Sequence, residues 1–336
     1  MPIIKDVAQY AGVSVATVSR CINTPSKVLP ETRNKVEEAM QVLRYRYNSL
    51  ARGFVTRQTR ILGVVVPTIT DPVFAESLRG IQDTAEKKGY HIILGNTDYN
   101  GTKEQRLLRK LREQQVEGIV LTSSDLHGEA LEELREDGFP CVLLYSKMTK
   151  GPLSSVGVDN VEGGRMAASY LLERGHRRIG MLAGSFNLSD RSLHRFQGFR
   201  DCLEEAGIGL DSKLVVETGF SLKDCNNTVA RLMEHNPAPT ALFCSNDLLA
   251  VGAMAGLRNI GLEVPGDVSI IGFDDTQFAA SVTPALTTVR QPVYEMGKRG
   301  TSILLNMLEH GVSEIAHELL PLSLVVRESV AEAVQK

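Results

Sequence analysis

Between residues 61 and 290, short apolar segments alternate with longer helical segments. The segment "ILGVVVP" (61–67) is a continuous apolar run typical of a strand buried on both faces, and "SLRGIQDTAEKKG" (77–89) after it predicts a helix. Further strand-like segments follow at 91–95, 118–124, 141–146, 178–184, 213–219, 241–247 and 268–275. This order predicts two successive βα arrays, each with a parallel sheet covered by helices on both faces. Short returns near 286–290 and 321–326 indicate that the chain crosses between the two lobes near its end.

The charged residues are unevenly distributed along the chain. Residues 1–60 hold ten basic and four acidic side chains, a net charge of +6, whereas the whole chain carries −3 and the remainder therefore −9. A basic N-terminal region on an acidic body predicts a polyanion as the partner of the N-terminal region. Charge alone leaves open the alternative of a basic face that contacts only solvent.

The pattern within the N-terminal region predicts three short helices. The first ends at Gly12, and Ser14 is a favourable N-cap for the second. A third helix is expected from Pro30 through Leu43. Two short helices joined by a tight turn that contains glycine form a helix-turn-helix, so residues 14–23 are the predicted recognition helix for the DNA major groove. The apolar face expected for this helix consists of Val15, Val18 and Ile22.

The segments "IKDVAQYAGVSVATVSRCIN" (4–23) and "TRNKVEEAMQVLRYRYNSLARGF" (32–54) closely resemble the head and hinge of the lactose/galactose repressor family of bacterial transcriptional regulators. The body resembles the family too, so the match covers nearly the whole chain. The resemblance implies an N-terminal all-α helix-turn-helix head and an α/β two-lobed body like a periplasmic binding protein, with two Rossmann-like parallel-sheet lobes. The expected domains are a head at 1–46, a hinge at 47–60 and an effector-binding and dimerisation domain at 61–336. Within that domain, lobe 1 is expected at about 61–160 and 291–320, and lobe 2 at about 161–290 and 321–336.

The residue types of the recognition helix suit DNA. Arg20 can bond guanine O6 and N7 bidentately, which is worth about 1–3 kcal/mol of discrimination, and Val15 and Ala16 can touch a thymine methyl. The resemblance places these three residues at base-reading positions. Four polar residues suit phosphate contacts: Ser14, Thr17, Ser19 and Asn23. The expected DNA-binding set is completed, at the end of the head and in the hinge, by Tyr45, Asn48, Ala51, Arg52 and Phe54.

The hinge and the third helix depart from the family pattern. In the family, the hinge folds into a short helix only on DNA and drives an apolar wedge into the minor groove. Here Tyr47 precedes Asn48 where the family usually has proline, and Phe54 replaces the usual leucine wedge. Phenylalanine is an accepted wedge residue. Leu29 stands where the family often has a serine cap, which predicts a loss of local stability.

Strand ends in an α/β body point into a cleft, so polar and aromatic residues after the strands are candidate effector contacts. The predicted effector-binding set consists of Asp71, Phe74, Tyr145, Arg191, Arg195, Phe220, Asn246, Asp274 and Gln291. The resemblance places six of them at common effector-site positions: Phe74, Arg195, Phe220, Asn246, Asp274 and Gln291. Carboxylates and amides beside aromatic faces suit the vicinal hydroxyls of a sugar.

Two arginines bear on the effector's charge. Arg191 precedes Arg195 by four residues, so the two share a face if the segment is helical. Two guanidiniums near one cleft favour an anionic group, which predicts a sugar acid or a sugar phosphate. If Arg191 instead points to solvent or pairs with Asp190, a neutral sugar or a nucleoside is the alternative.

Motifs of catalysis and metal binding are absent from the sequence. No G-x-G-x-x-G follows a strand, and there is no phosphate-binding loop, H-E-x-x-H or G-x-S-x-G motif. The histidines form no ligand-spaced pair, and the five cysteines are scattered without a C-x-x-C, as expected for interior side chains. We therefore expect no catalytic residues, no metal and no cofactor. A degenerate sugar enzyme is a further alternative, but it leaves the basic N-terminal region unexplained.

The partners and location follow from the same reading. No apolar run of 18 residues occurs and the N-terminus lacks signal-peptide features, so we expect a cytoplasmic protein with no membrane contact. The family normally reads a near-palindromic operator as a dimer, and no leucine heptad tail follows residue 330, so a homodimer is predicted, with the helix at 71–89 forming much of the contact. The expected function is a ligand-responsive repressor of double-stranded DNA operators with a small carbohydrate-type effector. A nucleoside- or purine-responsive repressor of the same fold is the alternative.

Overall fold

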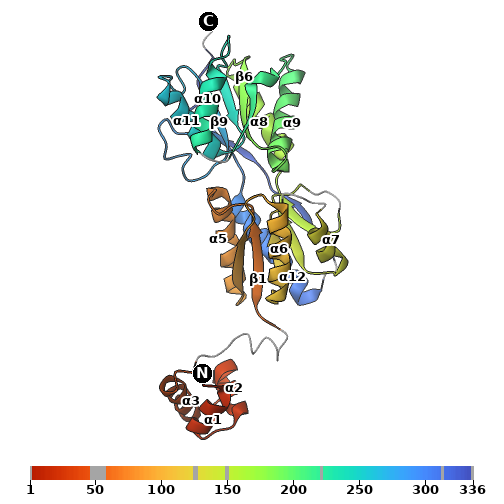
Figure 1. The fold of residues 1–336 in the computed structure, drawn as a ribbon, viewed down its shortest axis with the longest axis vertical. Helices are drawn as coiled ribbons and strands as arrows, with labels where there is room; N and C mark the ends of the chain where they lie inside the picture. Colours follow the sequence, from red (N-terminus) through yellow and green to blue (C-terminus); the bar gives the residue numbers. More distant parts are fainter. Residues whose placement is uncertain are drawn as a thin grey trace. The chain divides into compact units, whose positions relative to one another are not determined.

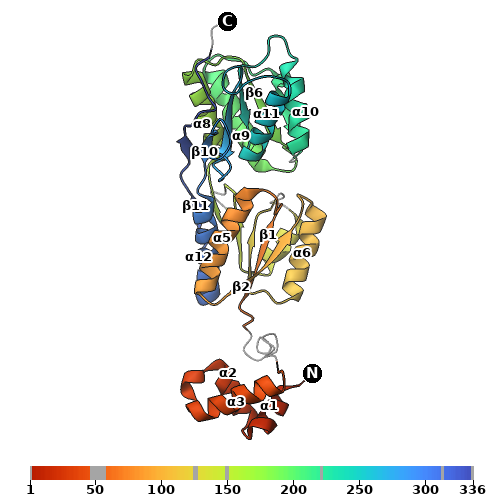
Figure 2. The same cartoon turned by 90° about the vertical axis from the view of Figure 1, so that its left-hand side faces the viewer.

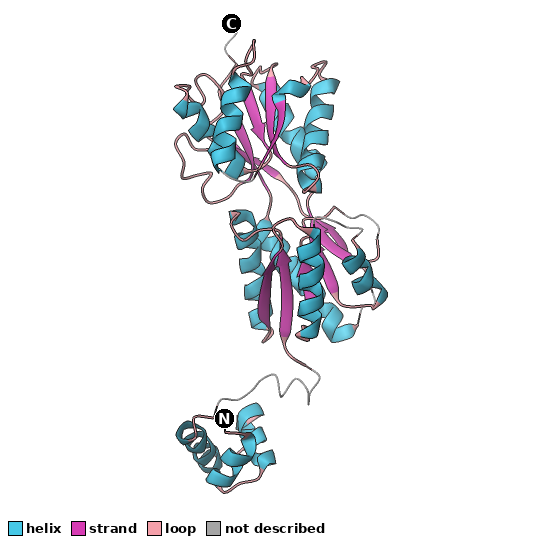
Figure 3. Ribbon diagram, viewed as in Figure 1, coloured by secondary structure: helices cyan, strands magenta, loops and turns pink. Residues whose placement is uncertain are grey.

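The computed structural model describes residues 2–45, 58–123, 128–147, 151–219, 222–311 and 314–333. The chain divides into two units, Met1–Thr59 and Arg60–Lys336. The described part of the first unit is helical, and the second unit combines helices with strands (Figure 3).

The first unit packs three helices around a small core. Its elements are α1 (Ile4–Ala11), α2 (Val15–Asn23), the 3₁₀ helix η1 (Pro25–Lys27) and α3 (Pro30–Val42) (Figure 1). Gly12 adopts φ +67°, the left-handed conformation that ends α1 and starts the turn. The Ser14 side chain accepts a hydrogen bond from the backbone N–H of Thr17 at 3.1 Å, so it caps α2. The predicted helix-turn-helix is present.

The core of the first unit corrects one expectation about α2. Val18 is fully buried there, but Val15 is 40% exposed and lies outside the core. Cys21, one turn further along α2 than Val18, is buried in the core. Val15 is the first residue of α2, where the helix extends beyond the small core, so its side chain stays on the surface.

In the second unit, one sheet has the strand order β11-β5-β4-β3-β1-β2, and every pairing in it is parallel. We call this sheet and its helices lobe 1. Its strands are β1 (Ile61–Val66), β2 (His91–Asn96), β3 (Gly118–Leu121), β4 (Cys141–Leu144), β5 (Ser154–Gly157) and β11 (His317–Leu319). Its helices are α5 (Pro72–Lys87), α6 (Gly101–Glu113), α7 (Glu129–Glu136) and α12 (Val293–His310).

The other sheet, with its helices, forms lobe 2 and has the order β12-β10-β9-β8-β6-β7. Its strands are β6 (Ile179–Gly184), β7 (Val215–Thr218), β8 (Ala241–Cys244), β9 (Ser269–Asp274), β10 (Thr287–Arg290) and β12 (Ser323–Val325). Its helices are α8 (Asn160–Glu173), α9 (Asp190–Glu205), η2 (Ser212–Leu214), α10 (Leu222–Met233) and α11 (Asp247–Asn259). The short β12 runs antiparallel to β10, and the other pairings are parallel.

Helices cover both faces of each sheet. In lobe 1, α5 and α12 pack side by side on one face of the sheet, and α6 lies on the other (Figure 2). In lobe 2, α8 and α9 cover one face, and α10 and α11 cover the other (Figure 2). The alternation of β1 explains this arrangement: Val64 joins the core beneath α5 and α12, whereas Val65 joins the core beneath α6 and α7.

The close packing of α8 against α9 depends on two glycines. A Cβ atom at Gly164 would lie 2.0 Å from the carbonyl oxygen of Arg195, and one at Gly198 would lie 1.8 Å from that of Val161. Only glycine therefore lets these helices approach so closely. The contact also brings the start of α8 beside Arg195 of α9.

The chain passes between the lobes at 158–159, 291–292 and 320–322. Within each lobe, the first five strands follow the order 2-1-3-4-5. In such sheets ligands bind outside the carboxyl ends of the strands, where the strand order reverses. The topology therefore places the candidate site at the strand ends of both lobes.

Candidate functional site

The exposed side of α2 carries the residues predicted to bind DNA. Ser14, Val15, Ala16 and Arg20 are exposed, and Thr17 and Ser19 are half-buried. The side chain of Arg20 forms no ion pair with any described residue, so its guanidinium is available to an external partner. The face thus has a compact apolar stretch beside one cation, the two chemistries that read thymine methyls and guanines.

The rest of the predicted DNA-binding set is only partly described. Tyr45 is half-buried against the core of the first unit, so its ring supports the fold of this unit. Asn23 ends α2, and its side chain lies outside the described part of the structure. Four hinge residues also lie outside the described residues: Asn48, Ala51, Arg52 and Phe54.

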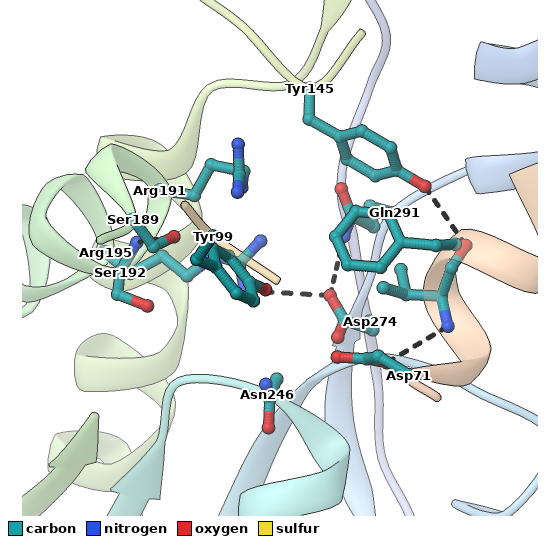
Figure 4. A pocket seen from close by; sticks show the side chains of 12 residues that line it. Asp71, Tyr99, Tyr145, Ser189, Arg191, Ser192, Arg195, Asn246, Asp274 and Gln291 are labelled. Carbon is teal, nitrogen blue, oxygen red and sulfur yellow. Dashed lines mark hydrogen bonds and ion pairs between the residues drawn. The ribbon is translucent and has the colours of Figure 1, made fainter. Parts of the chain in front are cut away.

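A pocket lies between the lobes, at the carboxyl ends of their strands (Figure 4). Its lining consists of Asp71, Val73, Phe74, Tyr99, Tyr145, Ser189, Arg191, Ser192, Arg195, Asn246, Asp274 and Gln291. The structure therefore brings together eight of the nine residues predicted to bind the effector. The ninth, Phe220, lies outside the described residues.

Lobe 1 contributes aromatic rings and one carboxylate to the pocket. Phe74 packs edge-on against Tyr145, with ring centroids 5.3 Å apart. The Tyr145 hydroxyl donates to the carbonyl oxygen of Val73 at 3.1 Å, which fixes the ring at the start of α5. Asp71 caps α5 by accepting from the Val73 N–H, and burial raises the pKa of this carboxyl. These contacts hold the lobe 1 side chains of the pocket in place in the absence of a ligand.

Tyr99 follows β2 and was not predicted. It lies in a tight turn with φ +56°, and its neighbour Asp98 has φ +53°. Burial raises the pKa of the Tyr99 phenol to about 12, and the nearby charge of Arg191 opposes this rise. Tyr99 is therefore a neutral hydroxyl at physiological pH, able to donate or accept a hydrogen bond.

Arg195 connects several elements of lobe 2. Its Nε donates to Asn160 Oδ1 at 2.8 Å, and its Nη1 donates to the carbonyl oxygen of Ser245 at 2.5 Å. Its guanidinium lies 3.5 Å from the ring centroid of Phe273, and its Nη1 is 3.7 Å from Asp274 Oδ1. Burial lowers the pKa of Arg195 to about 10, so the side chain stays charged near neutral pH. Arg195 thus ties α8 and α9 to the ends of β8 and β9.

Arg191 lies one turn earlier on α9, and its environment differs. Its side chain is only 7% exposed, yet Nη1 and Nη2 have no hydrogen-bond partner. Asp190 Oδ1 is 3.5 Å from Nη1, an ion pair without a hydrogen bond. Arg191 lines the pocket as expected and does not point to solvent. It does pair with Asp190, so the ion pair named above as favouring a neutral sugar or a nucleoside is present.

Asp274 and Gln291 meet where β9 ends and the chain leaves β10 for lobe 1. Gln291 Nε2 donates to Asp274 Oδ1 at 2.6 Å, and Gln291 Oε1 is buried without a partner. Asp274 has φ +114°, a strained conformation for a residue with a side chain. Burial raises the pKa of the Asp274 carboxyl well above its ordinary value, and Arg195 opposes this rise. Strain and burial of this kind concentrate at binding sites.

Other pocket residues were missed by the sequence analysis. Ser189 caps α9 by accepting from the Ser192 N–H at 3.4 Å, and both serines line the pocket. Asn246, which was predicted, caps α11 by accepting from the Leu249 N–H at 2.8 Å. Tyr99 and Ser189 could have been found from the rule that gave the others, because both follow a strand at its carboxyl end.

The described residues contain neither a candidate metal site nor a helix that could span a membrane. No group of three or more His, Cys, Asp or Glu side chains that could hold a metal ion occurs among the described residues. The five cysteines are free and buried, as expected from their spacing. Within the described residues, no helix has the length and apolarity needed to cross a membrane.

Fold and site together define a class of protein, with a helix-turn-helix unit joined to a two-lobed body like a periplasmic binding protein. Family comparison agrees with this class. Residues 3–48 match the model for bacterial regulatory proteins of the lacI family, and residues 168–330 match the model for a periplasmic binding protein-like domain.

Individual relatives span nearly the whole chain. Catabolite control protein A of Priestia megaterium is 35% identical over 97% of this chain and 98% of its own length. The lac repressor dimer bound to operator and the anti-inducer ONPF aligns with a TM-score of 0.86 at 28% identity, over 98% of this chain and 99% of that one. The transcriptional regulator CelR–cellobiose complex aligns with a TM-score of 0.74 at 31% identity, over 98% of this chain and 100% of that one. The chain belongs to the lacI family of bacterial regulatory proteins, and these relatives are transcriptional regulators.

Proposed function

We propose that this chain is a repressor that binds a near-palindromic DNA operator as a homodimer, and that a small carbohydrate-type effector in the interlobe pocket switches its affinity for DNA. The proposed domains are the head at 1–46, the hinge at 47–60 and the effector-binding and dimerisation domain at 61–336. Such a protein acts on DNA in the cytoplasm.

The DNA-binding part of the proposal rests on α2. Its exposed face presents Arg20 beside Val15 and Ala16, and the first 60 residues carry a net charge of +6. Positive charge supplies affinity for phosphates, and Arg20 supplies discrimination at a guanine. We propose that Phe54 in the hinge is the minor-groove wedge, because phenylalanine can unstack a base step.

The single observation that carries the effector part is that both lobes line one polar pocket. Asp71 and Tyr145 come from lobe 1, Arg191 and Asn246 come from lobe 2, and Gln291 lies in a segment that connects the lobes. A ligand that contacts both lobes favours one arrangement of the lobes over others, and this difference in affinity is what a switch requires. The structures of relatives with an operator or with cellobiose support the assignment.

The proposal is tested with the full-length chain and DNA selected from a random library. Fluorescence anisotropy should give specific binding that weakens steeply with salt, and sedimentation should give a dimer on each operator. A panel of glucose, ribose, gluconate, glucose 6-phosphate and adenosine is then added. At least one compound should change the dissociation constant for DNA by tenfold or more.

Two results would contradict the proposal. The first is the absence of any sequence preference in the selected DNA. The second is specific DNA binding that no compound in the panel alters. A response to adenosine alone would favour the nucleoside-responsive alternative over a carbohydrate effector.

A further inference from the structure

Arg191 and Arg195 both belong to α9 and line the pocket, but they differ in their hydrogen bonds. Arg195 Nε and Nη1 are bonded to Asn160 and Ser245, and its face is stacked on Phe273. Both bonds are internal to lobe 2, so two of the N–H groups of Arg195 are already paired before a ligand binds. Arg191 has no hydrogen bond at either terminal nitrogen.

A buried guanidinium without hydrogen bonds is unfavourable, because burial removes water without supplying other acceptors. Arg191 lines the pocket, and both its terminal nitrogens are buried. Asp190 Oδ1 forms an ion pair with Nη1 at 3.5 Å, but neither atom has a hydrogen-bond partner. The arrangement therefore leaves a planar fork of two donors for an acceptor that enters the pocket. A carboxylate matches this fork with two parallel bonds.

The position of Arg191 adds to this preference. Ser189 is the N-cap of α9, Arg191 and Ser192 lie in its first turn, and all three line the pocket. The N-terminus of a 16-residue helix carries partial positive charge, which stabilises an anion close to it. Two features of the same wall thus favour negative charge: a helix N-terminus, and a guanidinium whose terminal nitrogens lack hydrogen-bond partners.

A second unpartnered atom indicates what else the ligand carries. Gln291 Oε1 is buried without a partner, because Nε2 is the atom that bonds Asp274. An amide oxygen only accepts, so it requires a donor from the ligand, such as a hydroxyl. The side chains of Asp274 and Asn246 also line this part of the pocket. The ligand therefore combines an anionic group with hydroxyls.

Charge narrows the class further. Asp190 adjoins the pocket, so a doubly charged phosphate would meet more repulsion from its carboxylate than a singly charged ligand would.

Building on the proposed function, we propose that the effector is a polyhydroxy carboxylate, a sugar acid, and that Arg191 binds its carboxylate. Arg191 is then the residue that distinguishes the acid from the neutral sugar of the same shape. Arg195 is a positioning residue that holds the wall of the pocket.

Isothermal titration with the full-length chain tests this assignment through matched pairs of probes. The pairs are gluconate with glucitol, glucuronate with glucose, and galacturonate with galactose, and glucose 6-phosphate is a separate arm. At least one acid should bind ten times or more tightly than its neutral partner. That acid should also change the dissociation constant for selected DNA.

Variants connect this preference to one side chain. Arg191→Gln should remove most of the advantage of the acid and leave the neutral sugar unaffected. Arg191→Lys keeps the charge but loses the planar fork. Its affinity for the acid should therefore fall between those of the wild type and Arg191→Gln. Arg200→Gln is the matched control, because it removes an exposed arginine from the same helix, paired with Asp201, and should leave every affinity unchanged.

Any of the following outcomes contradicts the assignment of a sugar acid bound by Arg191. Tighter binding of a neutral sugar or adenosine, unaffected by Arg191→Gln, rejects the sugar acid but leaves the proposed repressor function standing. Preference for glucose 6-phosphate over every acid rejects the carboxylate. Equal loss of acid and neutral binding in Arg191→Gln, with a reduced melting temperature, assigns Arg191 a structural role. If no probe binds or affects DNA binding, the effector part of the proposed function fails as well.

Discussion

The exposed face of α2 and the interlobe pocket are built in opposite ways. On α2 the candidate contacts project from a small core, and Arg20 and Ala16 are exposed. In the pocket the candidate contacts are buried, and Arg195 and Asp274 are bonded to their neighbours. The candidate contacts on α2 are still hydrated in the folded chain. Those of the pocket lose their water when the chain folds.

This difference predicts how substitutions act. A side chain without partners in its own chain can be removed with little effect on folding, so its substitution changes binding alone. A buried side chain that connects several elements affects both folding and binding. The following substitutions test the contrast, from the largest expected effect to the smallest.

Replacing Arg195 with alanine should have the largest effect. It leaves Asn160 Oδ1 and the Ser245 carbonyl without their donor and Asp274 without its opposite charge. Removing one partner of a buried charge pair costs about 3–5 kcal/mol. Urea denaturation of the full chain should show the lower free energy of unfolding. Faster hydrogen exchange in α8 and α9 should locate the loss in lobe 2.

Arg191→Ala serves as the comparison on the same helix. Its terminal nitrogens have no hydrogen bonds to lose, so the free energy of unfolding should change by less than about 1 kcal/mol. Equal destabilisation by the two substitutions would show that the pocket arginines do not differ in the way described above.

Replacing Arg20 with alanine should affect DNA binding and leave stability unchanged. If Arg20 reads a guanine, the loss is about 1–3 kcal/mol on the selected operator and much less on random DNA. Fluorescence anisotropy on both DNAs measures the difference, and thermal unfolding of the full chain is the control. An equal loss on both DNAs would make Arg20 a phosphate contact.

Much of the fold could be predicted because it depends on local patterns. Alternation of strand and helix segments gave two parallel-dominated sheets, and Gly12 with Ser14 gave the turn before α2. Strand ends gave most of the pocket, because parallel strands bring their carboxyl ends to one edge. The antiparallel β12 was not predicted, since three residues carry too little pattern to show their direction.

What could not be predicted depends on packing at longer range. Val15 has the helical spacing of a core residue, and only the small size of the head core leaves it exposed. The bonding of Arg195 to Asn160 requires the approach of α8 to α9 at Gly164 and Gly198, which no local pattern encodes. The two arginines are the same residue type at helical spacing, so their different partners follow from the tertiary structure alone.

The buried carboxyl of Asp247 predicts a pH dependence of the body. Asp247 accepts bonds from the Thr276 N–H, the Thr276 hydroxyl and the Thr288 hydroxyl, and burial raises its pKa to about 7. In the unfolded chain an aspartate titrates near 3.9, so between about pH 4 and pH 7 unfolding releases a proton. The stability contributed by this group is therefore full below about pH 4 and is lost as the pH rises through about 7.

Asp247→Asn removes this titration and should flatten the pH profile. The slope of unfolding free energy against pH should change by up to about 1.4 kcal/mol per pH unit, the value for one proton. Urea denaturation at intervals from pH 4 to pH 8 measures it. The exposed Asp98→Asn is the control, because its carboxyl pairs with Lys103 at the surface and its pKa is lowered. Parallel profiles for the wild type and Asp247→Asn would contradict a raised pKa at this position.

The smallest expected effect is a gain in stability at the start of α3. Leu29 is the N-cap residue, is 75% exposed and forms no capping hydrogen bond. A serine there can accept from a free N–H of the first turn, which is worth about 1 kcal/mol. Hydrogen exchange of the α3 amides in Leu29→Ser should slow accordingly, while ligand affinity of the pocket stays unchanged. Leu29→Ala removes the same exposed side chain without adding an acceptor, so equal slowing in both variants would assign the gain to the loss of leucine and not to the cap. A gain in Leu29→Ser alone would show that the head can be stabilised at its surface without disturbing the buried contacts of the pocket.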